Sequence, residues 1–194
     1  MNRTLAALMM TVTALGAAFS AAPALAQTAK GPTAVVSPQP LPIDDSRPRV
    51  FLGGSIDMGG APDWQAAMTS ALADMDVVIL NPRRPDWNPE WRPEADEPEF
   101  RRQVEWELAA LESADVIVMY FAPGTQSPIS LLEMGLHARG GKLIVLAPQG
   151  FWRKGNVDIT AQAYGVKQVQ SLPELTAAVR EALSAAATQA RFAR

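Results

Sequence analysis

The stretch DVIVMYFAPGTQSPISLLEMG, residues 115–135, joins an unbroken apolar run to a loop of glycine and proline and then to a second apolar run. The first run has the length and composition of a strand buried on both faces, and Pro128 is placed where a proline starts a helix. The predicted helix carries one carboxylate, Glu133, with leucine or methionine on either side. A buried carboxylate is costly unless it is paired or used in chemistry, so Glu133 is the first candidate for a functional group.

Strand and helix patterns alternate on both sides of this stretch. Strands that are nearly all apolar and are separated by helices predict a parallel sheet with helices on both faces. The predicted fold is one α/β domain, doubly wound and flavodoxin-like or Rossmann-like, with a parallel sheet of about five strands. This domain is predicted to occupy residues 50–194, with strands at 49–53, 77–80, 115–121, 142–147 and 166–169 and helices at 61–74, 98–113, 128–139 and 172–190.

The composition limits the kinds of function that the chain can have. Its 194 residues are 48% hydrophobic and 19% charged, as in an ordinary globular protein with one core. A net charge of -3 and scattered basic residues do not indicate binding to nucleic acid or anionic lipid, so a small molecule or a protein is the expected partner. The chain has no cysteine, which excludes thiolate catalysis. It has one histidine, His137, so neither a His-rich metal site nor a Ser-His-Asp triad is favoured.

The first 26 residues have the pattern of a signal peptide. A basic start at residues 1–3 is followed by an apolar run at 5–22 and by Ala24-Leu25-Ala26, the small-x-small pattern that signal peptidases recognise. The prediction is cleavage before Gln27 and an exported protein, periplasmic or secreted, with no stable membrane anchor after cleavage. A retained membrane anchor is the alternative.

Residues 27–49 are rich in proline, threonine, serine and alanine. Proline cannot donate a backbone hydrogen bond, so this composition predicts an extended linker without regular pairing. The prolines of this segment are Pro32, Pro38, Pro40, Pro42 and Pro48.

In a doubly wound sheet, ligands bind at the carboxyl ends of the strands. The turn Gly53-Gly54-Ser55 follows the first predicted strand, and its backbone could approach a ligand closely, although a tight turn explains the glycines equally well. The turn has neither the dinucleotide-binding spacing nor the Walker A lysine. The loop after the second predicted strand carries Asn81, Arg83, Arg84 and Trp87, and a solvated connector is its other explanation.

Two further acidic residues flank the central stretch. Glu107 lies on the helix predicted at 98–113, where a surface charge is the ordinary explanation. Asp115 opens a strand and can either cap a turn or bind a ligand. His137 follows Glu133 by one helical turn and is expected to be a partly exposed helix residue.

Four motifs occur together and in a fixed order in one known group of proteins. The chain resembles the nucleoside 2-deoxyribosyltransferase superfamily, in particular its nucleoside 2-deoxyribosyltransferase-like branch, over about residues 50–169. It is similar, more distantly, to the deoxynucleoside 5'-monophosphate N-glycosidases. The motifs are FLGGSI at 51–56, NPRRPDW at 81–87, QVEWELAALESADVIVMYF at 103–121 and SPISLLEMG at 127–135.

The resemblance implies a role for both glutamates. Glu133 matches the glutamate that serves as nucleophile in the superfamily. Glu107 matches the acidic residue that helps to protonate the leaving base, although the glycosidases have aspartate there. The resemblance implies that no metal or organic cofactor is needed, and that the protein forms a homo-oligomer, because members complete their sites across subunit contacts.

The resemblance also places substrate contacts and reveals one departure. Gly54 and Ser55 match a turn that borders the sugar and any phosphate, and Ser127 matches a serine that contacts phosphate in monophosphate-specific members. Phe51 replaces a tyrosine that many relatives carry, so a hydroxyl expected near the nucleophile is missing. The candidate substrate-binding residues are Gly53, Gly54, Ser55, Asn81, Arg83, Asp115 and Ser127.

The chemistry implied by the resemblance is cleavage or transfer of the N-glycosidic bond of a nucleoside or nucleotide. Such a reaction passes through an oxocarbenium-like state that a carboxylate can stabilise or trap. Two alternatives remain open at this point. The protein could bind a nucleotide-like ligand without cleaving it, or it could be an interaction module that docks a partner through Trp87 and Trp91.

Overall fold

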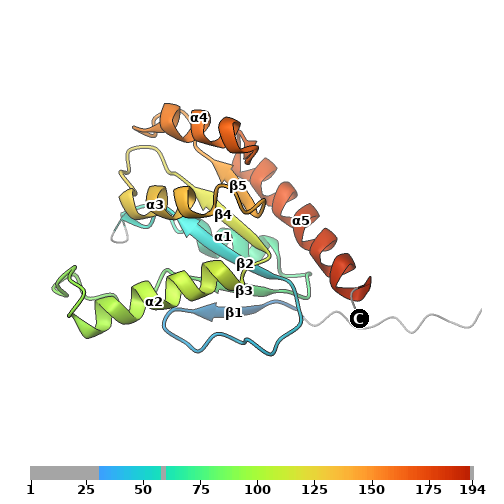
Figure 1. Ribbon diagram of the computed structural model, residues 1–194, viewed down its shortest axis with the longest axis horizontal. Coiled ribbons are helices and arrows are strands. Elements are labelled where there is room, and N and C mark those ends of the chain that lie inside the picture. Colours follow the sequence, from blue (N-terminus) through green and yellow to red (C-terminus); the bar gives the residue numbers. More distant parts are fainter. Residues whose placement is uncertain (1–30, 58–59, 193–194) are drawn as a thin grey trace, which may run out of the picture.

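The computed structural model describes residues 31–57 and 60–192. In these residues, a six-stranded sheet is covered by helices on both faces (Figure 1). The strands are β1 (Thr33–Val36), β2 (Arg49–Gly54), β3 (Val78–Asn81), β4 (Val116–Tyr120), β5 (Leu143–Leu146) and β6 (Lys167–Val169). The helices are α1 (Trp64–Ala71), α2 (Pro98–Ser113), α3 (Pro128–His137), α4 (Lys154–Tyr164) and α5 (Leu172–Phe192).

The strand order is β1-β3-β2-β4-β5-β6, and every neighbouring pair is parallel. Without β1, this is the flavodoxin-like order 2-1-3-4-5, so the predicted doubly wound α/β fold is confirmed. The strand count is six rather than about five. The order reverses between β2 and β4, and the carboxyl ends of these two strands therefore form the edge at which such sheets bind ligands.

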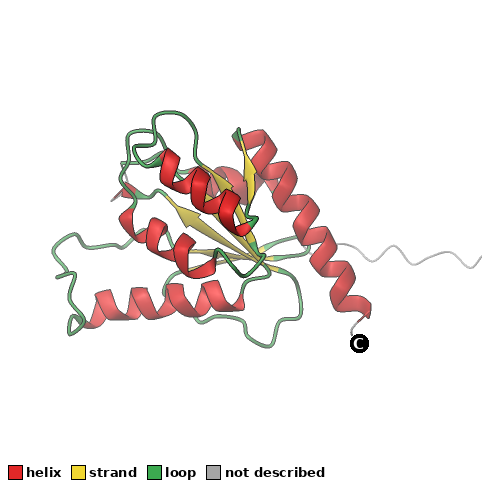
Figure 2. Cartoon of the chain, turned by 45° about the horizontal axis from the view of Figure 1, so that its top comes forward, coloured by secondary structure: helices red, strands yellow, loops and turns green. Residues whose placement is uncertain are grey.

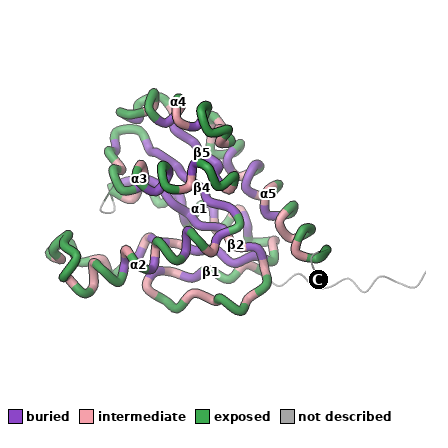
Figure 3. Tube along the Cα trace, in the orientation of Figure 1, coloured by how far each residue is buried: buried purple, intermediate pink, exposed green. Residues whose placement is uncertain are grey.

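Side chains of successive strand residues point to opposite faces of the sheet and build two separate apolar layers. Phe51 belongs to the layer covered by α2, α3 and α4, whereas Val50 and Leu52 belong to the layer covered by α1 and α5. Figure 2 shows helices on both sides of the sheet, and in Figure 3 the central strands are buried while the outer faces of the helices are exposed. Burial on both faces explains why the central strands read as continuous apolar runs.

The prediction that residues 27–49 form a linker is wrong for the part that the structure describes. Residues Thr33–Val36 form strand β1, which pairs with Val78–Asn81 of β3 in parallel register. None of the prolines falls within these four residues, since Pro32 precedes the strand and Pro38 follows it. An edge strand needs hydrogen bonds on one side only, so prolines at its two ends are compatible with it. The folded domain therefore begins before residue 50.

One additional helix and both ends of another helix also differ from the prediction. Helix α4 lies between the last two strands, where no helix was predicted, because its buried side is only Val157 and Ala161. Helix α1 runs from Trp64 to Ala71 rather than from residue 61 to residue 74. The other predicted elements lie within about two residues of their observed bounds, a usual uncertainty for helix and strand ends.

The predicted signal peptide, residues 1–26, lies outside the residues that the structure describes. Among the helices of residues 31–57 and 60–192, none has the length and apolar character needed to cross a membrane.

Candidate active site

The floor of the candidate site is the place where β2 ends against β4. Gly54 has a φ of +129°, and a Cβ on it would lie 2.2 Å from the carbonyl oxygen of Tyr120. A Cβ on Gly53 would lie 2.8 Å from the sulfur of Met119. Both glycines lie within strand β2 rather than in a tight turn. Close approach to the backbone of Tyr120 requires Gly54, whether or not a ligand binds, whereas a Cβ on Gly53 would meet the ends of the Met119 and Phe51 side chains.

Helix α3 places Glu133 beside the carboxyl ends of β2 and β4. The helix is fixed to β2 by Ser130, whose Oγ donates to the carbonyl oxygen of Gly54 at 2.9 Å. Glu133 is only 7% exposed. Burial, and then the negative charge of Glu107, raise the pKa of Glu133 to about 8, and no hydrogen bond within the described residues offsets them. A carboxyl in these surroundings stays protonated at neutral pH unless a positive charge develops beside it.

Glu107 faces the same space from α2. It is half-buried, and its Oε1 accepts a hydrogen bond of 2.8 Å from Nε2 of Gln103, one helical turn earlier. Burial raises the pKa of Glu107, and the hydrogen bond from Gln103 acts in the opposite direction. The structure thus excludes a simple surface charge for Glu107 and brings together the two glutamates that the sequence singled out.

Three hydroxyls meet beside this pair. Ser55 Oγ lies 2.7 Å from Thr125 Oγ1 and 2.6 Å from Ser127 Oγ. The N–H of Ala122 donates to Ser55 Oγ at 2.8 Å, and Thr125 Oγ1 donates to the carbonyl oxygen of Ala122 at 2.8 Å. The Thr125 proton is used on that carbonyl, so the two shortest contacts between hydroxyls each hold one proton when Ser55 donates to Thr125 and Ser127 donates to Ser55. The contact of 3.1 Å between Thr125 Oγ1 and Ser127 Oγ then holds none.

This proton count separates the roles of the two serines. Ser55 is fully buried, and its hydroxyl is committed to the cluster. Ser127 is half-buried and precedes α3 in a left-handed conformation, with φ of 46° and no hydrogen bond from its side chain to the first turn of the helix. Ser127 therefore presents lone pairs rather than a proton on its free side.

The loop between β3 and α2 is largely exposed, as in a solvated connector, but part of it folds on itself around the buried side chain of Arg84. Trp87 and Trp91 pack edge to face with ring centroids 5.2 Å apart, and the guanidinium of Arg84 lies 4.7 Å from the Trp91 ring centre. Arg84 is buried and forms an ion pair of 2.8 Å with Asp86 and one of 3.5 Å with Glu99. Arg84 and both tryptophans thus have structural partners within or next to the loop.

Asn81 and Arg83 lie near the site, at the carboxyl end of β3. Asn81 Oδ1 accepts from the N–H of Arg83 at 3.0 Å and so shapes the turn after the strand. The guanidinium of Arg83 donates to the carbonyl oxygen of Ala61 at 3.2 Å and lies 3.8 Å from the carboxylate of Asp63. These contacts direct Arg83 toward the start of α1, on the side of the sheet opposite α2 and α3.

Asp115 is not brought to the site. It immediately precedes β4, and its Oδ2 accepts from the N–H of Arg49 at 2.8 Å. Both residues lie at the amino ends of their strands, so Asp115 belongs to the opposite edge of the sheet and acts as a structural cap. His137 ends α3 and is half-buried, as expected.

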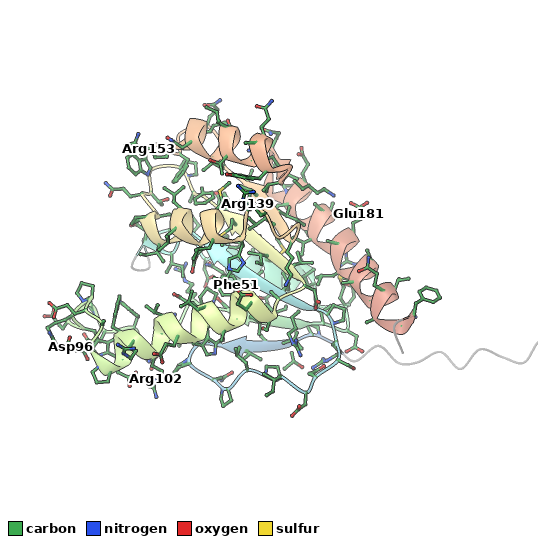
Figure 4. The ribbon with its side chains drawn as sticks, viewed as in Figure 1. Phe51, Asp96, Arg102, Arg139, Arg153 and Glu181 are labelled. Atoms are coloured by element: carbon green, nitrogen blue, oxygen red, sulfur yellow. The ribbon has the colours of Figure 1, made fainter. Side chains whose placement is uncertain are left out.

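Phe51 is fully buried on β2, between α2 and α3 (Figure 4). Its ring lies in the apolar layer that also holds Trp106 and Met134. A phenylalanine supplies no hydroxyl to Glu133, so the acid–base chemistry of the site depends on the two glutamates and their polar neighbours.

The structure adds residues that the sequence did not single out. Thr125 completes the hydroxyl cluster, and its place in the loop before α3 was the available signal. Gln103 contacts Glu107, and the spacing of four residues along a predicted helix was the signal for that contact. Ser37, which donates to Gln103 at 2.6 Å, had no signal because it lies in the segment predicted to be a linker.

The match to a known family covers every residue of this site named above except Ser37. The profile of the family described as Nucleoside 2-deoxyribosyltransferase like matches residues 47–151, from the approach to β2 to the loop after β5. No curated protein matches the chain. The family match spans more than half of the 194 residues and includes both glutamates. The chain therefore belongs to the nucleoside 2-deoxyribosyltransferase-like family, an enzyme family whose substrates are small nucleosides.

Proposed function

We propose that the protein cleaves or transfers the N-glycosidic bond of a nucleoside or nucleotide, with Glu133 as nucleophile and Glu107 as general acid. One observation carries the proposal. Two carboxyls, the buried Glu133 and the half-buried Glu107, lie close enough for the charge of Glu107 to raise the pKa of Glu133, at the edge where doubly wound sheets bind ligands. Structural carboxylates are ordinarily paired with cations, whereas neither of these two forms an ion pair within the described residues.

The chemistry follows from the charges of the reaction. As the bond from the sugar to the base breaks, the electron pair leaves with the base, and positive charge develops at the anomeric carbon. Glu133 gives up its proton to solvent as this positive charge develops and bonds to that carbon, while the proton of Glu107 passes to the base nitrogen. An incoming base or water then attacks the anomeric carbon and displaces Glu133, and the ionised Glu107 takes up the proton that the incoming group gives up.

The raised pKa values of the two glutamates fit their roles as nucleophile and general acid. Because the pKa of Glu133 is about 8, the pair holds at least one proton at neutral pH. Positive charge on the sugar favours the ionised form of Glu133, since opposite charges attract strongly in a buried site. Glu107 then holds the proton that remains on the pair, and it donates this proton to the departing base.

A product assay tests the proposal. The protein is incubated with deoxynucleosides, ribonucleosides and their 5'-monophosphates, with and without an acceptor base, and free base is measured. We expect release that is lost in Glu133→Gln and retained in Glu112→Gln, a matched change at an exposed glutamate. Dependence on the acceptor base distinguishes transfer from hydrolysis. Undiminished release by Glu133→Gln would refute the assignment of the nucleophile.

The second candidate function is binding of a nucleotide-like ligand without turnover. The observation that favours it is Phe51, which provides no hydroxyl beside the nucleophile. Calorimetry with the same panel of compounds decides this alternative. Heat of binding without release of base from any compound would support the binding protein and refute the enzyme.

We further propose that the protein is exported and loses its first 26 residues. The support is the pattern of a basic start, an apolar run and Ala24-Leu25-Ala26 in the sequence. Fractionation of the source cells, followed by amino-terminal sequencing, tests this. A mature chain starting at Gln27 outside the cytoplasm is expected, and an uncleaved cytoplasmic chain would contradict it.

A homo-oligomer is also proposed. Its support is an apolar stripe on α3, formed by Ile129, Leu132 and Leu136, which are 59%, 60% and 60% exposed. Helical spacing places this stripe directly beside Glu133, so a second copy covering it would also narrow the entrance to the site. Light scattering during gel filtration gives the mass. We expect an oligomer that Leu132→Lys dissociates, and a monomeric unaltered protein would contradict the proposal.

A further inference from the structure

We propose that Gln103 is a positioning residue that keeps the proton of Glu107 on Oε2, and that Ser37 holds Gln103 in this role. The consequence for catalysis rests on the proposed function, whereas the orientation of the side chains rests on their contacts alone. Three segments that are far apart in the sequence meet here: the turn after β1, the loop after β3, and α2.

The backbone carbonyl of Pro82 fixes which way the Gln103 amide points. Nε2 of Gln103 lies 3.0 Å from the carbonyl oxygen of Pro82 and 2.8 Å from Oε1 of Glu107. A carbonyl oxygen can only accept, so the amide nitrogen must face Pro82. A flipped amide would place two acceptor oxygens against each other. The opposite side of the amide is satisfied as well, because Ser37 Oγ donates to Gln103 Oε1 at 2.6 Å.

The orientation of the amide determines where Glu107 carries its proton. Oε1 of Glu107 accepts an N–H from Gln103, and the carbonyl oxygen of a neutral carboxylic acid accepts more strongly than its hydroxyl oxygen. The neutral acid therefore carries its proton on Oε2, the oxygen that Gln103 leaves free for a departing base. If the amide were reversed, Glu107 would donate to Gln103 and its proton would be held inside the protein.

The surroundings of Gln103 are built to hold this arrangement. Gln103 and Ser37 are 5% and 3% exposed. The N–H of Ser37 donates to the carbonyl oxygen of Asn81 at 3.0 Å, which extends the pairing of β1 with β3. Nε1 of Trp106 donates to the carbonyl oxygen of Gln39 at 2.7 Å, and this contact ties α2 to the same turn. A buried network with every member satisfied is rigid, which is the property that orienting an acid requires.

The test compares two leaving groups in Gln103→Met, a variant of similar shape without the donor. With a natural nucleoside we expect kcat to fall about 10-fold to 100-fold at nearly unchanged KM, part of the roughly 10²–10⁴ that a general acid contributes. A nitrophenyl deoxyriboside needs no protonation to leave, so its cleavage should stay within about twofold. Equal losses with both substrates would indicate a merely structural role and would overturn the proposal.

A second measurement does not depend on turnover. Carboxyl carbon NMR of the ligand-free protein follows the titration of Glu107, and loss of the Gln103 donor should raise the pKa of this group. Gln162→Met, an exposed change on α4, is the matched control. An unchanged pKa in Gln103→Met would overturn the positioning role. If the unaltered protein cleaves neither substrate, the proposed function fails, and the NMR result still decides the orientation.

Ser37→Ala gives a graded version of the same test. The Pro82 carbonyl still orients the amide in this variant, so we expect a loss of about fivefold with the nucleoside, the equivalent of one ordinary hydrogen bond. A loss larger than that of Gln103→Met would show that Ser37 acts by another route and would overturn its assigned role.

Discussion

The two ends of the sheet hold carboxylates in opposite surroundings. At the amino end, the guanidinium of Arg47 donates to Asp45 and lowers the pKa of that carboxyl to about 2. At the carboxyl end, burial and Glu107 raise the pKa of Glu133 to about 8. The first end uses ion pairs to join segments of the fold, whereas the second places carboxyls together without a cation. Ion pairs also occur at the carboxyl end, as between Arg84 and Asp86, so the absence of a cation beside Glu133 is particular to the site and marks it as a functional candidate.

Glu133→Gln gives the largest expected effect on activity and a gain in stability. Loss of the nucleophile should lower kcat by at least about a thousandfold. The pKa of Glu133 is raised in the folded protein, so its contribution to stability is fully present below about pH 4 and is lost as the pH rises through about 8. Above pH 8, we expect the variant to be more stable than the unaltered protein by roughly 2–4 kcal/mol. Urea unfolding at pH 5 and pH 9 measures the difference, and equal stabilities at both pH values would contradict the raised pKa.

Glu107→Gln tests whether the two carboxyls at the carboxyl end act on each other. Removing the negative charge of Glu107 should lower the pKa of Glu133, which carboxyl carbon NMR can follow. The rate of base release should fall by about 10²–10⁴ because the general acid is lost. A pKa of Glu133 that does not move would mean that burial alone sets it.

Arg47→Met tests the opposite end of the sheet. Asp45 has a lowered pKa in the folded protein, so the pair contributes stability above about pH 4, and this contribution is lost as the pH falls toward about 2. The side chains of the pair are 20% and 24% exposed, so we expect a loss of only about 1 kcal/mol at pH 7 and no loss at pH 2. Activity should not change. A large loss of activity would mean that the two ends are coupled.

Thr125→Val gives the smallest expected effect. It tests, within the site, whether the hydroxyl cluster controls the proton of Ser127. Without the Thr125 hydroxyl, Ser55 can donate to Ser127, which frees the Ser127 proton for a ligand. The ratio of kcat/KM for a 5'-monophosphate to that for its nucleoside should then rise about fivefold, the worth of one hydrogen bond. Thr125→Ser keeps the hydroxyl and is the control. An unchanged ratio would show that Ser127 does not contact that end of the substrate.

Most of the fold could be predicted because strands buried on both faces have a continuous apolar pattern. Strand β1 could not, because it has only four residues between prolines and half of its backbone hydrogen bonding faces solvent. Helix α4 has two buried side chains, too few to give a clear helical period. Local patterns thus fail for the elements that contribute least to the core.

The site was predictable where a residue's own neighbours in the sequence revealed its surroundings. Glu133 stands in an apolar helix, and its burial follows from that context. Ser37 and Gln103 are 66 positions apart, and only the folded chain brings them together. Asp115 was included because it adjoins an important strand, although the start of a parallel strand lies away from the ligand-binding edge.

The prolines around β1 have a consequence for the free edge of the sheet. The outer side of β1 is unpaired within the described residues, and an open strand edge is a template for pairing with other chains. Pro32 and Pro38 stand immediately before this strand and two positions after it, and neither can donate to an added strand. A chain shortened to begin at residue 50 would instead expose β3, with the sequence VILN and no proline inside it. The segment that looked too rich in proline to fold is therefore the part that protects this sheet from aggregation.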